Sequence, residues 1–402
     1  MNKKLSLLVF IAFAFVAGCV TSCKEEELGP SIFDTNDYPL DRTSYCFPLD
    51  TFLKVNFLEP YNVRFIYRME DIGSDMTKNL TPASYEKSVQ LAVLAKYLWY
   101  SIYEKHAGAE FLKANSPRII HVIGSKNYNP SQGTEILGVA EGGLKISFYN
   151  TNNLNVADID MMNEYFFKTM HHEFGHILDQ THLRPTSFNL ISRSQYDAST
   201  WTETPDSIAA GRGFVSPYAS SAPGEDWVEV LANYVTRDTV SWSRLINSAS
   251  YEWEEVDMEW SDYAKASIGA NLDTVGYFRY TDSGDGKVYR RVCARNADGT
   301  VALDDNGQVQ WLNNSGIHGD LIIQQKIELV ANWLKENWGV SLYDLRREVQ
   351  QRQYVTNPDG SFKFDAAGRL INKLTAPSDS DPSKTLMDIL VDEVNAYKSL
   401  QH

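Results

Sequence analysis

Two histidines four residues apart, His172 and His176, enclose a glutamate, Glu173, in the stretch from residue 170 to residue 180. Side chains at positions i and i+4 of a helix lie on the same face, so both imidazoles can reach one metal ion. In the His-Glu-x-x-His pattern the histidines bind zinc and the glutamate acts as a general base. The spacing therefore predicts zinc chemistry, with Glu173 beside the metal and not bound to it.

The helix that carries this motif must also pack on a core. Four apolar residues fall roughly opposite the two histidines on a helical projection: Phe166, Met170, Phe174 and Ile177. We expect this face to be buried and the histidines to point towards a cleft. His171 lies about 100° from His172 on the same projection, which suits a structural or solvent-facing role.

Catalytic zinc usually takes three protein ligands, and two residues could supply the third. His182 occupies the last position of the longer pattern His-Glu-x-x-His-x-x-Gly-x-x-His, but Asp179 stands where that pattern has glycine for a sharp turn. Glu225 begins a predicted helix, and Glu229 follows it by one turn. This second helix could supply Glu225 as the ligand, while Glu229 hydrogen-bonds a ligand histidine.

The elements that position these residues alternate between strands and helices. We expect strands at 51–56, 62–67, 118–123 and 143–149, a helix from Thr81 to about His106, and the motif helix from Asp158 or Asp160. Further helices are predicted at 225–235, 321–337, 342–351 and 383–399. The pattern predicts an α+β fold.

This order resembles the upper half of a zincin, in which an edge strand borders the cleft and pairs with an extended peptide. The segment 143–149 is a candidate for that strand, and an interior strand is the alternative. Two similar stretches, 296–311 and 357–372, each predict a turn, a short strand, a turn and a further strand. We expect domains at 46–280, zincin-like and catalytic, and at 281–402, helical with hairpin insertions.

The first 22 residues predict a bacterial lipoprotein signal peptide, because two lysines precede an apolar run that is too short for a reliable membrane span. Cys19 and Cys23 each follow a sequence that resembles the lipobox. The acidic run after Cys23 favours that cysteine for lipidation, with Cys19 as the alternative. We expect residues 23–45 to form a polar tether. The acidic run after Cys23 resembles the signal that sends some Gram-negative lipoproteins to the cell surface, and this resemblance implies an outer-membrane anchor exposed there.

Composition and charge narrow the class of protein. The chain has 402 residues, 43% of them hydrophobic, which is enough for a large core. Its 37 basic and 52 acidic residues give a net charge of −15, and no basic stripe is present, which argues against nucleic acid as a partner. Cys46 and Cys293 remain after the leader, and they could form a disulfide or stay unpaired.

The joint pattern of Tyr218, Glu225 and Glu229, with the motif at 172–176, resembles the lethal-factor-type gluzincin peptidases and their bacterial proline-directed relatives. Tyrosine precedes the ligand glutamate by seven residues, and a second glutamate follows it by four. The resemblance covers about residues 140–240. It implies Glu225 as the third ligand, Tyr218 as a donor to the oxyanion and Glu229 as the residue that orients a ligand histidine.

With its lipoprotein leader, the chain is most similar to the substrate import-associated zinc metallohydrolase lipoproteins, which are associated with TonB-dependent SusC/SusD-like import systems. That resemblance implies a surface-anchored metallopeptidase that holds one Zn²⁺ per chain and hydrolyses peptide bonds in a peptide or protein. The alternative is a non-catalytic substrate-binding lipoprotein of an import complex, with a structural or vestigial zinc site.

Overall fold

The computed structural model describes residues 40–69, 79–128, 135–136, 138–141, 144–256, 277–279 and 288–401. Contacts divide the chain into two compact units, Met1–Arg42 and Thr43–His402. Cys19, Cys23, the predicted signal peptide and most of the predicted tether lie outside the described residues. Every described helix and strand belongs to the second unit.

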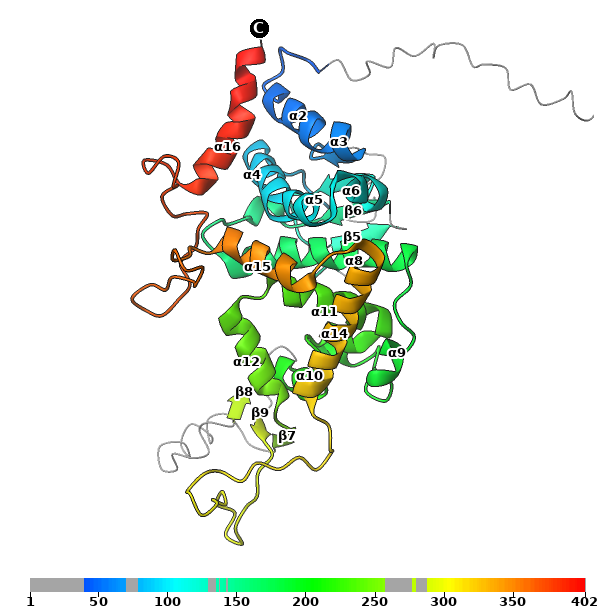
Figure 1. The fold of residues 1–402 in the computed structure, drawn as a ribbon, viewed down its shortest axis with the longest axis vertical. Helices are drawn as coiled ribbons and strands as arrows, with labels where there is room; N and C mark the ends of the chain where they lie inside the picture. The colour runs from blue at the N-terminus through cyan, green and yellow to red at the C-terminus, as the bar shows by residue number, and fades with distance from the viewer. Residues whose placement is uncertain are drawn as a thin grey trace, which may run out of the picture. The chain divides into compact units, whose positions relative to one another are not determined.

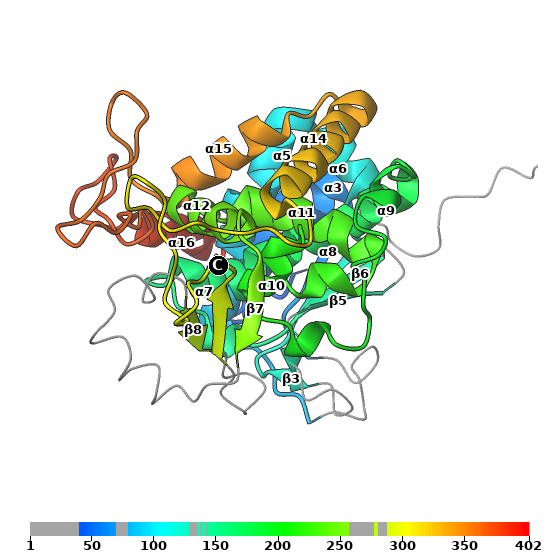
Figure 2. The same ribbon diagram turned by 90° about the horizontal axis from the view of Figure 1, so that it is seen from below.

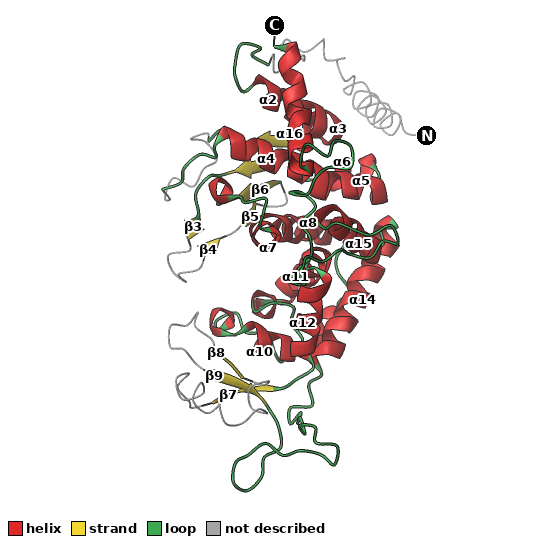
Figure 3. Cartoon of the chain, turned by 90° about the vertical axis from the view of Figure 1, so that its left-hand side faces the viewer, coloured by secondary structure: helices red, strands yellow, loops and turns green. Residues whose placement is uncertain are grey.

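Helices make up most of the regular structure (Figure 3). Three of the longest helices are each interrupted by a π-helical turn: η1 (Lys54–Leu58), η2 (Lys96–Tyr100) and η4 (Asn163–Phe167). The described α-helices are α2 (Phe47–Leu53), α3 (Glu59–Tyr61), α4 (Tyr85–Ala95), α5 (Ser101–Ala107), α6 (Ala109–Asn115), α7 (Ile159–Met162), α8 (Lys168–Thr181), α9 (Phe188–Ile191), α10 (Asp206–Gly211), α11 (Pro223–Thr236), α12 (Thr239–Ala249), α14 (Gly319–Trp338), α15 (Leu342–Gln353) and α16 (Leu386–Asn395). Short 3₁₀ turns are η3 (Thr151–Asn153), η5 (Trp201–Glu203), η6 (Tyr218–Ser221) and η8 (Ala396–Leu400). Among the described residues, no helix has the length and apolar character needed to cross a membrane.

The described strands form three small sheets. The main sheet has the order β1 (Arg64–Ile66), β2 (Ile119–Val122), β6 (Lys145–Phe148) and β5 (Gly138–Glu141), in which only the β5–β6 pair is antiparallel. A two-stranded ladder joins β3 (Asn127–Tyr128) to β4 (Glu135–Ile136). The third sheet is antiparallel in the order β7 (Trp253–Val256), β9 (Val288–Arg291) and β8 (Tyr277–Arg279) (Figure 2). Together with the helices, these sheets make an α+β fold, as the sequence predicted.

Of the two predictions for the segment 143–149, the interior strand is confirmed and the edge strand is wrong, because β6 has hydrogen-bonded neighbours on both sides. The edge of the main sheet is β5, which is short and contains Gly138. A Cβ atom on Gly138 would lie 2.3 Å from Cγ2 of Thr169, so glycine is needed where this strand approaches α8. The edge strand therefore lies against the motif helix (Figure 1).

The predicted strand at 51–56 is also wrong, because these residues belong to α2 and η1. Pro48 stands in the first turn of α2, where proline is favoured. The buried residues follow helical spacing and not alternation: Leu49, Phe52, Leu53 and Phe57. These two signals indicated a helix.

The other predicted elements are present, with shifted ends. The helix expected from Thr81 begins at Tyr85, where the Ser84 hydroxyl accepts a hydrogen bond from the backbone N–H of Lys87. Pro82 instead forms an isolated bridge with Ile123. The motif helix begins at Ile159 with Asp158 as its N-cap, and α14 ends at Gly339 in the left-handed conformation.

The two similar stretches form matching meanders. Bridges join Arg295 to Val301 and Leu303 to Val309, and the equivalent bridges join Thr356 to Phe362 and Phe364 to Leu370. In each first turn an aspartate, Asp298 or Asp359, accepts bonds from the backbone and hydroxyl two residues later. These aspartates therefore stabilise turns, as the hairpin interpretation predicted. Cys46 is buried, Cys293 is half-buried, and neither forms a disulfide.

A buried ion pair ties α11 to α14. Lys326 Nζ lies 2.6 Å from Asp226 Oδ2, and both side chains are fully buried. Lys326 also donates to the carbonyl of Gly213, and the Tyr196 hydroxyl donates to Asp226. Because Asp226 follows the candidate ligand Glu225, this pair fixes the first turn of α11.

We expect Lys326→Met to lower the free energy of unfolding by about 3–5 kcal/mol, because it leaves the Asp226 carboxylate buried without a counter-charge. Denaturant unfolding followed by tryptophan fluorescence measures the change. The matched control is Lys335→Met, an exposed position of the same helix, where we expect a change within about 0.5 kcal/mol. Adding Asp226→Asn to Lys326→Met removes the unpaired charge and should recover part of the loss. A double variant less stable than Lys326→Met would contradict this explanation.

Candidate metal centre

The candidate centre lies where α8 crosses α11. The apolar face of α8 is buried as predicted, and Phe174 packs against the rings of Trp99, Tyr103 and Phe111. On the side of α11, a Cβ atom on Gly175 would lie 3.0 Å from Cγ1 of Val228. Glycine inside the motif therefore lets the two helices approach closely.

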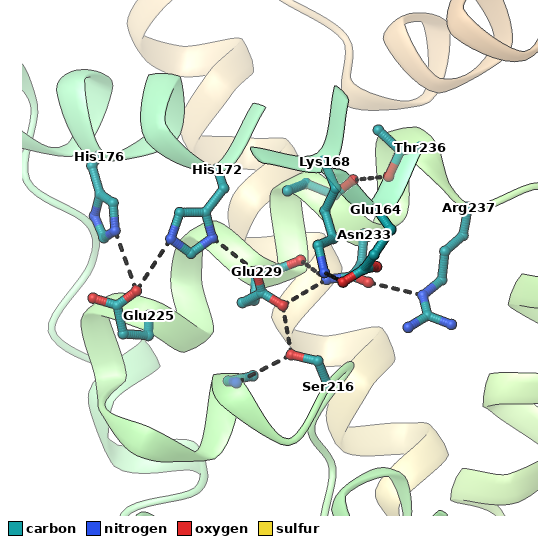
Figure 4. Close-up of polar contacts among 12 residues, drawn as sticks. Glu164, Lys168, His172, His176, Ser216, Glu225, Glu229, Asn233, Thr236 and Arg237 are labelled. Atoms are coloured by element: carbon teal, nitrogen blue, oxygen red, sulfur yellow. Dashed lines mark hydrogen bonds and ion pairs between the residues drawn. The ribbon is translucent and has the colours of Figure 1, made fainter. Parts of the chain in front are cut away.

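This close crossing brings three predicted ligands together. Glu225 Oε2 lies 3.2 Å from His172 Nε2 and 3.3 Å from His176 Nε2. Figure 4 shows the three side chains pointing toward one another. One ligand atom from each of the three residues lies within 4.8 Å of the others. A shared metal ion needs at least three histidine, cysteine or carboxylate side chains at such distances. Among the described residues, His172, His176 and Glu225 are the one group that meets this condition.

The donor set fits a zinc ion. The Glu225 Oε2 atom is buried and faces the two imidazole nitrogens, and within the described part of the chain no hydrogen bond of good geometry reaches it, which is costly for a carboxylate oxygen. A cation among the three atoms would compensate for that cost. Two imidazole nitrogens and one carboxylate oxygen form a ligand set that catalytic zinc uses.

Glu229 orients the first ligand histidine. Its Oε1 atom lies 2.8 Å from His172 Nδ1, and its Oε2 atom accepts hydrogen bonds from Ser216 Oγ at 2.5 Å and Asn233 Nδ2 at 3.0 Å. In the neutral ring, a proton on Nδ1 held by Glu229 leaves the Nε2 lone pair available to a metal ion. The buried carboxylate therefore fixes both the ring and its tautomer (Figure 4).

The carboxylates also set the protonation of His172 in the metal-free chain. Burial alone would lower the pKa of His172, but the carboxylates of Glu225 and Glu229 raise it to about 10. Burial works against the charge on these two glutamates as well. Even so, His172 and His176 hold the pKa of Glu225 well below its ordinary value. Lys168 and His172 do the same for the pKa of Glu229.

Glu173 and Tyr218 line a cleft of about 630 Å³ that also contains His172. Gly138 of the edge strand and Trp201 form parts of its wall. Burial raises the pKa of Glu173, and among the described residues no group donates a hydrogen bond to its carboxylate. Burial, and then Glu225, raise the pKa of Tyr218, so its hydroxyl keeps its proton and can donate it in a hydrogen bond.

His182 lies apart from this cluster. The α8 helix continues to Thr181, so the chain does not make the sharp turn that the longer histidine pattern requires after Asp179. The Asp179 carboxylate instead accepts a hydrogen bond of 2.7 Å from the backbone N–H of Arg184. The exposed His182 ring packs against Trp338, with centroids 5.0 Å apart.

His171 is structural and not solvent-facing. Its ring is fully buried, its Nδ1 atom lies 3.0 Å from the Tyr103 hydroxyl, and burial lowers its pKa to about 3. Sequence reasoning missed three other residues of the site: Trp201, Ser216 and Asn233. Asn233 follows Glu229 by four residues on a predicted helix, which was a usable signal. Trp201 and Ser216 come from the loop region before α11, where spacing carries no such signal.

The comparisons with known proteins agree with this geometry. The family described as "Putative zinc-binding metallo-peptidase" matches residues 45–343. The solved structure of a "putative zinc-binding metallo-peptidase" from Bacteroides caccae is 30% identical to this chain, with a TM-score of 0.53. The match covers 76% of this chain and 91% of that one. Among curated proteins, none matches. By the span of the family match and by this likeness, the chain belongs to the "Putative zinc-binding metallo-peptidase" family.

Proposed function

We propose that this protein is a single-zinc metallopeptidase of the gluzincin type with a zincin-like active-site region. The observation that carries the proposal is the convergence of three ligand atoms from His172, His176 and Glu225 beside the cleft that Glu173 lines. A structural zinc site needs no buried carboxylate without hydrogen bonds next to its ligands. Within the described part of the chain, Glu173 is such a carboxylate, and this favours an enzyme over a binding protein.

His172, His176 and Glu225 would hold the zinc ion. When bound there, zinc supplies a Lewis acid that polarises a carbonyl group and lowers the pKa of water. Glu173 then acts as general base: it accepts a proton from the attacking water and passes that proton to the leaving amine. Its raised pKa suits the first of these steps, because a stronger base accepts the proton more readily.

Two further groups would position the substrate. The Tyr218 hydroxyl, which stays protonated, donates a hydrogen bond to the developing oxyanion. Among the described strands, β5 pairs only with β6, so its other edge offers backbone groups to an extended peptide, and Gly138 of this strand lines the cleft. Both features favour a peptide bond in an extended chain as the substrate.

The setting of the enzyme is part of the proposal. The predicted signal peptide and the lipobox-like sequences before Cys19 and Cys23 support a lipid-anchored protein on the outer membrane, exposed at the cell surface. The family resemblance described above supports association with a SusC/SusD-like import system. Digestion of a mixed peptide library by the purified protein, with and without chelator, tests the function: cleavage that the chelator abolishes is expected, and its absence argues for a binding protein.

Replacing Glu173 with Gln should lower kcat by about 10²-fold to 10⁴-fold, because the general base is lost. Bound zinc should remain near one ion per chain, because Glu173 is not a ligand. The control Glu164→Gln removes a carboxylate from the same cleft, one that pairs with Lys168. Full activity of Glu173→Gln would exclude this mechanism.

The third ligand is tested by two alanine variants. We expect Glu225→Ala to lose most of its zinc, because only two imidazoles remain, while His182→Ala keeps it. Atomic absorption on both purified proteins measures the stoichiometry. Zinc kept by Glu225→Ala and lost by His182→Ala would show instead that His182 is the ligand.

Zinc binding should depend on pH through His172. Below its pKa of about 10, this imidazole carries a proton in the metal-free chain and must lose it to become a ligand. Apparent zinc affinity should therefore rise with pH, by about tenfold per unit for one released proton. Calorimetry in two buffers of different ionisation enthalpy counts the protons. Affinity that stays constant between pH 6 and pH 9 would contradict this assignment.

A further inference from the structure

Arg237 lies at the end of the helix that carries the candidate ligand Glu225. Glu225, Glu229, Asn233 and Arg237 follow one another at intervals of four residues along α11. In Figure 4, Arg237 lies on the opposite side of His172 from His176. It lines the same cleft as His172 and Glu173. A substrate bound at the metal therefore shares its cleft with this guanidinium.

The position of Arg237 is fixed by three hydrogen bonds. Its backbone N–H donates to the carbonyl of Asn233, and its carbonyl accepts from Gln350 Nε2 at 2.7 Å. Its Nε atom donates to Asn233 Oδ1 at 2.8 Å. Asn233 in turn donates to Glu229, which holds His172. A continuous chain of hydrogen bonds thus sets the arginine relative to the metal ligands.

Within the described part of the chain, the two terminal nitrogens of Arg237 form no hydrogen bond or ion pair with a protein group, since its one side-chain bond comes from Nε (Figure 4). Two acids of the cleft wall are engaged elsewhere, since Glu164 pairs with Lys168 and Glu135 pairs with Lys126. Outside the cleft wall, Asp160 lies within reach of the charge of Arg237, which opposes the rise that burial gives the pKa of Asp160. Asp206 also lines the cleft, from the first turn of α10. The terminal nitrogens form a planar fork that matches the two oxygens of a carboxylate.

We propose that Arg237 binds a carboxylate of the substrate and so makes this protein selective for peptides with an acidic group near the cut bond. This inference rests on the proposed peptidase function and names a substrate class for it. Both an acidic side chain and a free C-terminus carry the required group. Arg237 is a specificity-determining residue and takes no part in bond cleavage.

The helix limits where that carboxylate lies. Twelve residues separate Glu225 from Arg237, which is about 18 Å along a helix. An extended peptide advances about 3.3 Å per residue. The acidic group therefore belongs no more than about five residues from the cut bond.

Three matched peptide sets test the inference on the zinc-loaded protein. All are internally quenched fluorescent decapeptides: one carries a single Glu at successive positions and an amidated C-terminus, one has Gln in place of Glu, and one has Gln with a free C-terminus. We expect kcat/KM for one of the carboxylate sets to exceed that of the Gln amide set by about 10-fold to 100-fold. The set that is preferred identifies the side chain or the C-terminus as the source.

Substitutions then assign that preference to Arg237. In Arg237→Gln the ratio between carboxylate and amide peptides should fall to about 1, and in Arg237→Lys it should be intermediate, because a lysine keeps the charge and loses the fork. The ratio is measured within one sample, so it does not depend on the folded fraction. The control is Arg244→Gln, an exposed arginine of α12 that does not line this cleft; it should keep the wild-type ratio.

Equal cleavage of all sets by the wild type, or a preference that survives in Arg237→Gln, would overturn the inference and leave the peptidase function standing. If no set is cleaved, the peptidase proposal fails and binding decides the inference. The same peptide sequences, each with a single fluorescent label, are then titrated with the Glu173→Gln variant and followed by fluorescence anisotropy. A carboxylate peptide should bind more tightly than its Gln amide counterpart, and this difference should disappear in the double variant with Arg237→Gln. Equal or absent binding would overturn it.

Discussion

The candidate metal site depends above all on the distance at which α8 and α11 cross. His172 and His176 come from one helix and Glu225 from the other, so the three ligand atoms meet only if the two backbones approach closely. Gly175 lies at the contact, where even a methyl group would press on Val228. Inside the His-Glu-x-x-His motif, the fourth residue thus serves close packing, while the first, second and fifth are the residues to which the proposed chemistry assigns roles.

The position of α11 along this crossing is fixed from both ends. At its first turn, Asp226 is held by Lys326 and Tyr196 in a fully buried network. At its last turn, Gln350 of α15 holds the carbonyl of Arg237. Helices far along the chain therefore determine where Glu225 lies. Of these two contacts, that of Lys326 lies within the family match, which extends to residue 343, and that of Gln350 lies beyond it.

Local spacing was enough to predict much of the site. The motif, the capped helix that carries it, and α11 with its two glutamates all follow from intervals of three, four and seven residues along the sequence. These intervals define which side chains share a helix face, and helix geometry is the same in every protein. The side chains of His172, His176 and Glu225 therefore met as the pattern indicated.

Features that depend on distant contacts were not predictable in the same way. The edge strand is β5 and not the more apolar segment 143–149, because strand order depends on which neighbours pair and not on composition. Ser216 holds Glu229 from a loop whose path is set by the helices around it. The helix at 51–56 was missed although Pro48 marked its start, because its β-branched and aromatic residues also suit a strand.

The π-helical turn η4 gives the motif helix its direction. Four residues spaced at intervals of four are all fully buried: Met162, Phe166, Met170 and Phe174. In a regular α-helix, each such interval would rotate the next side chain by about 40° around the helix axis. The wider π-helical turn at 163–167 contains one additional residue. This residue rotates the side chains after the turn by roughly 100° around the helix axis, relative to those before it. The helix is thus two segments of different phase joined by a single inserted residue. Without that residue, a helix anchored at Asp158 would direct both histidines away from Glu225, so the whole metal site depends on a one-residue change in the length of the chain before it.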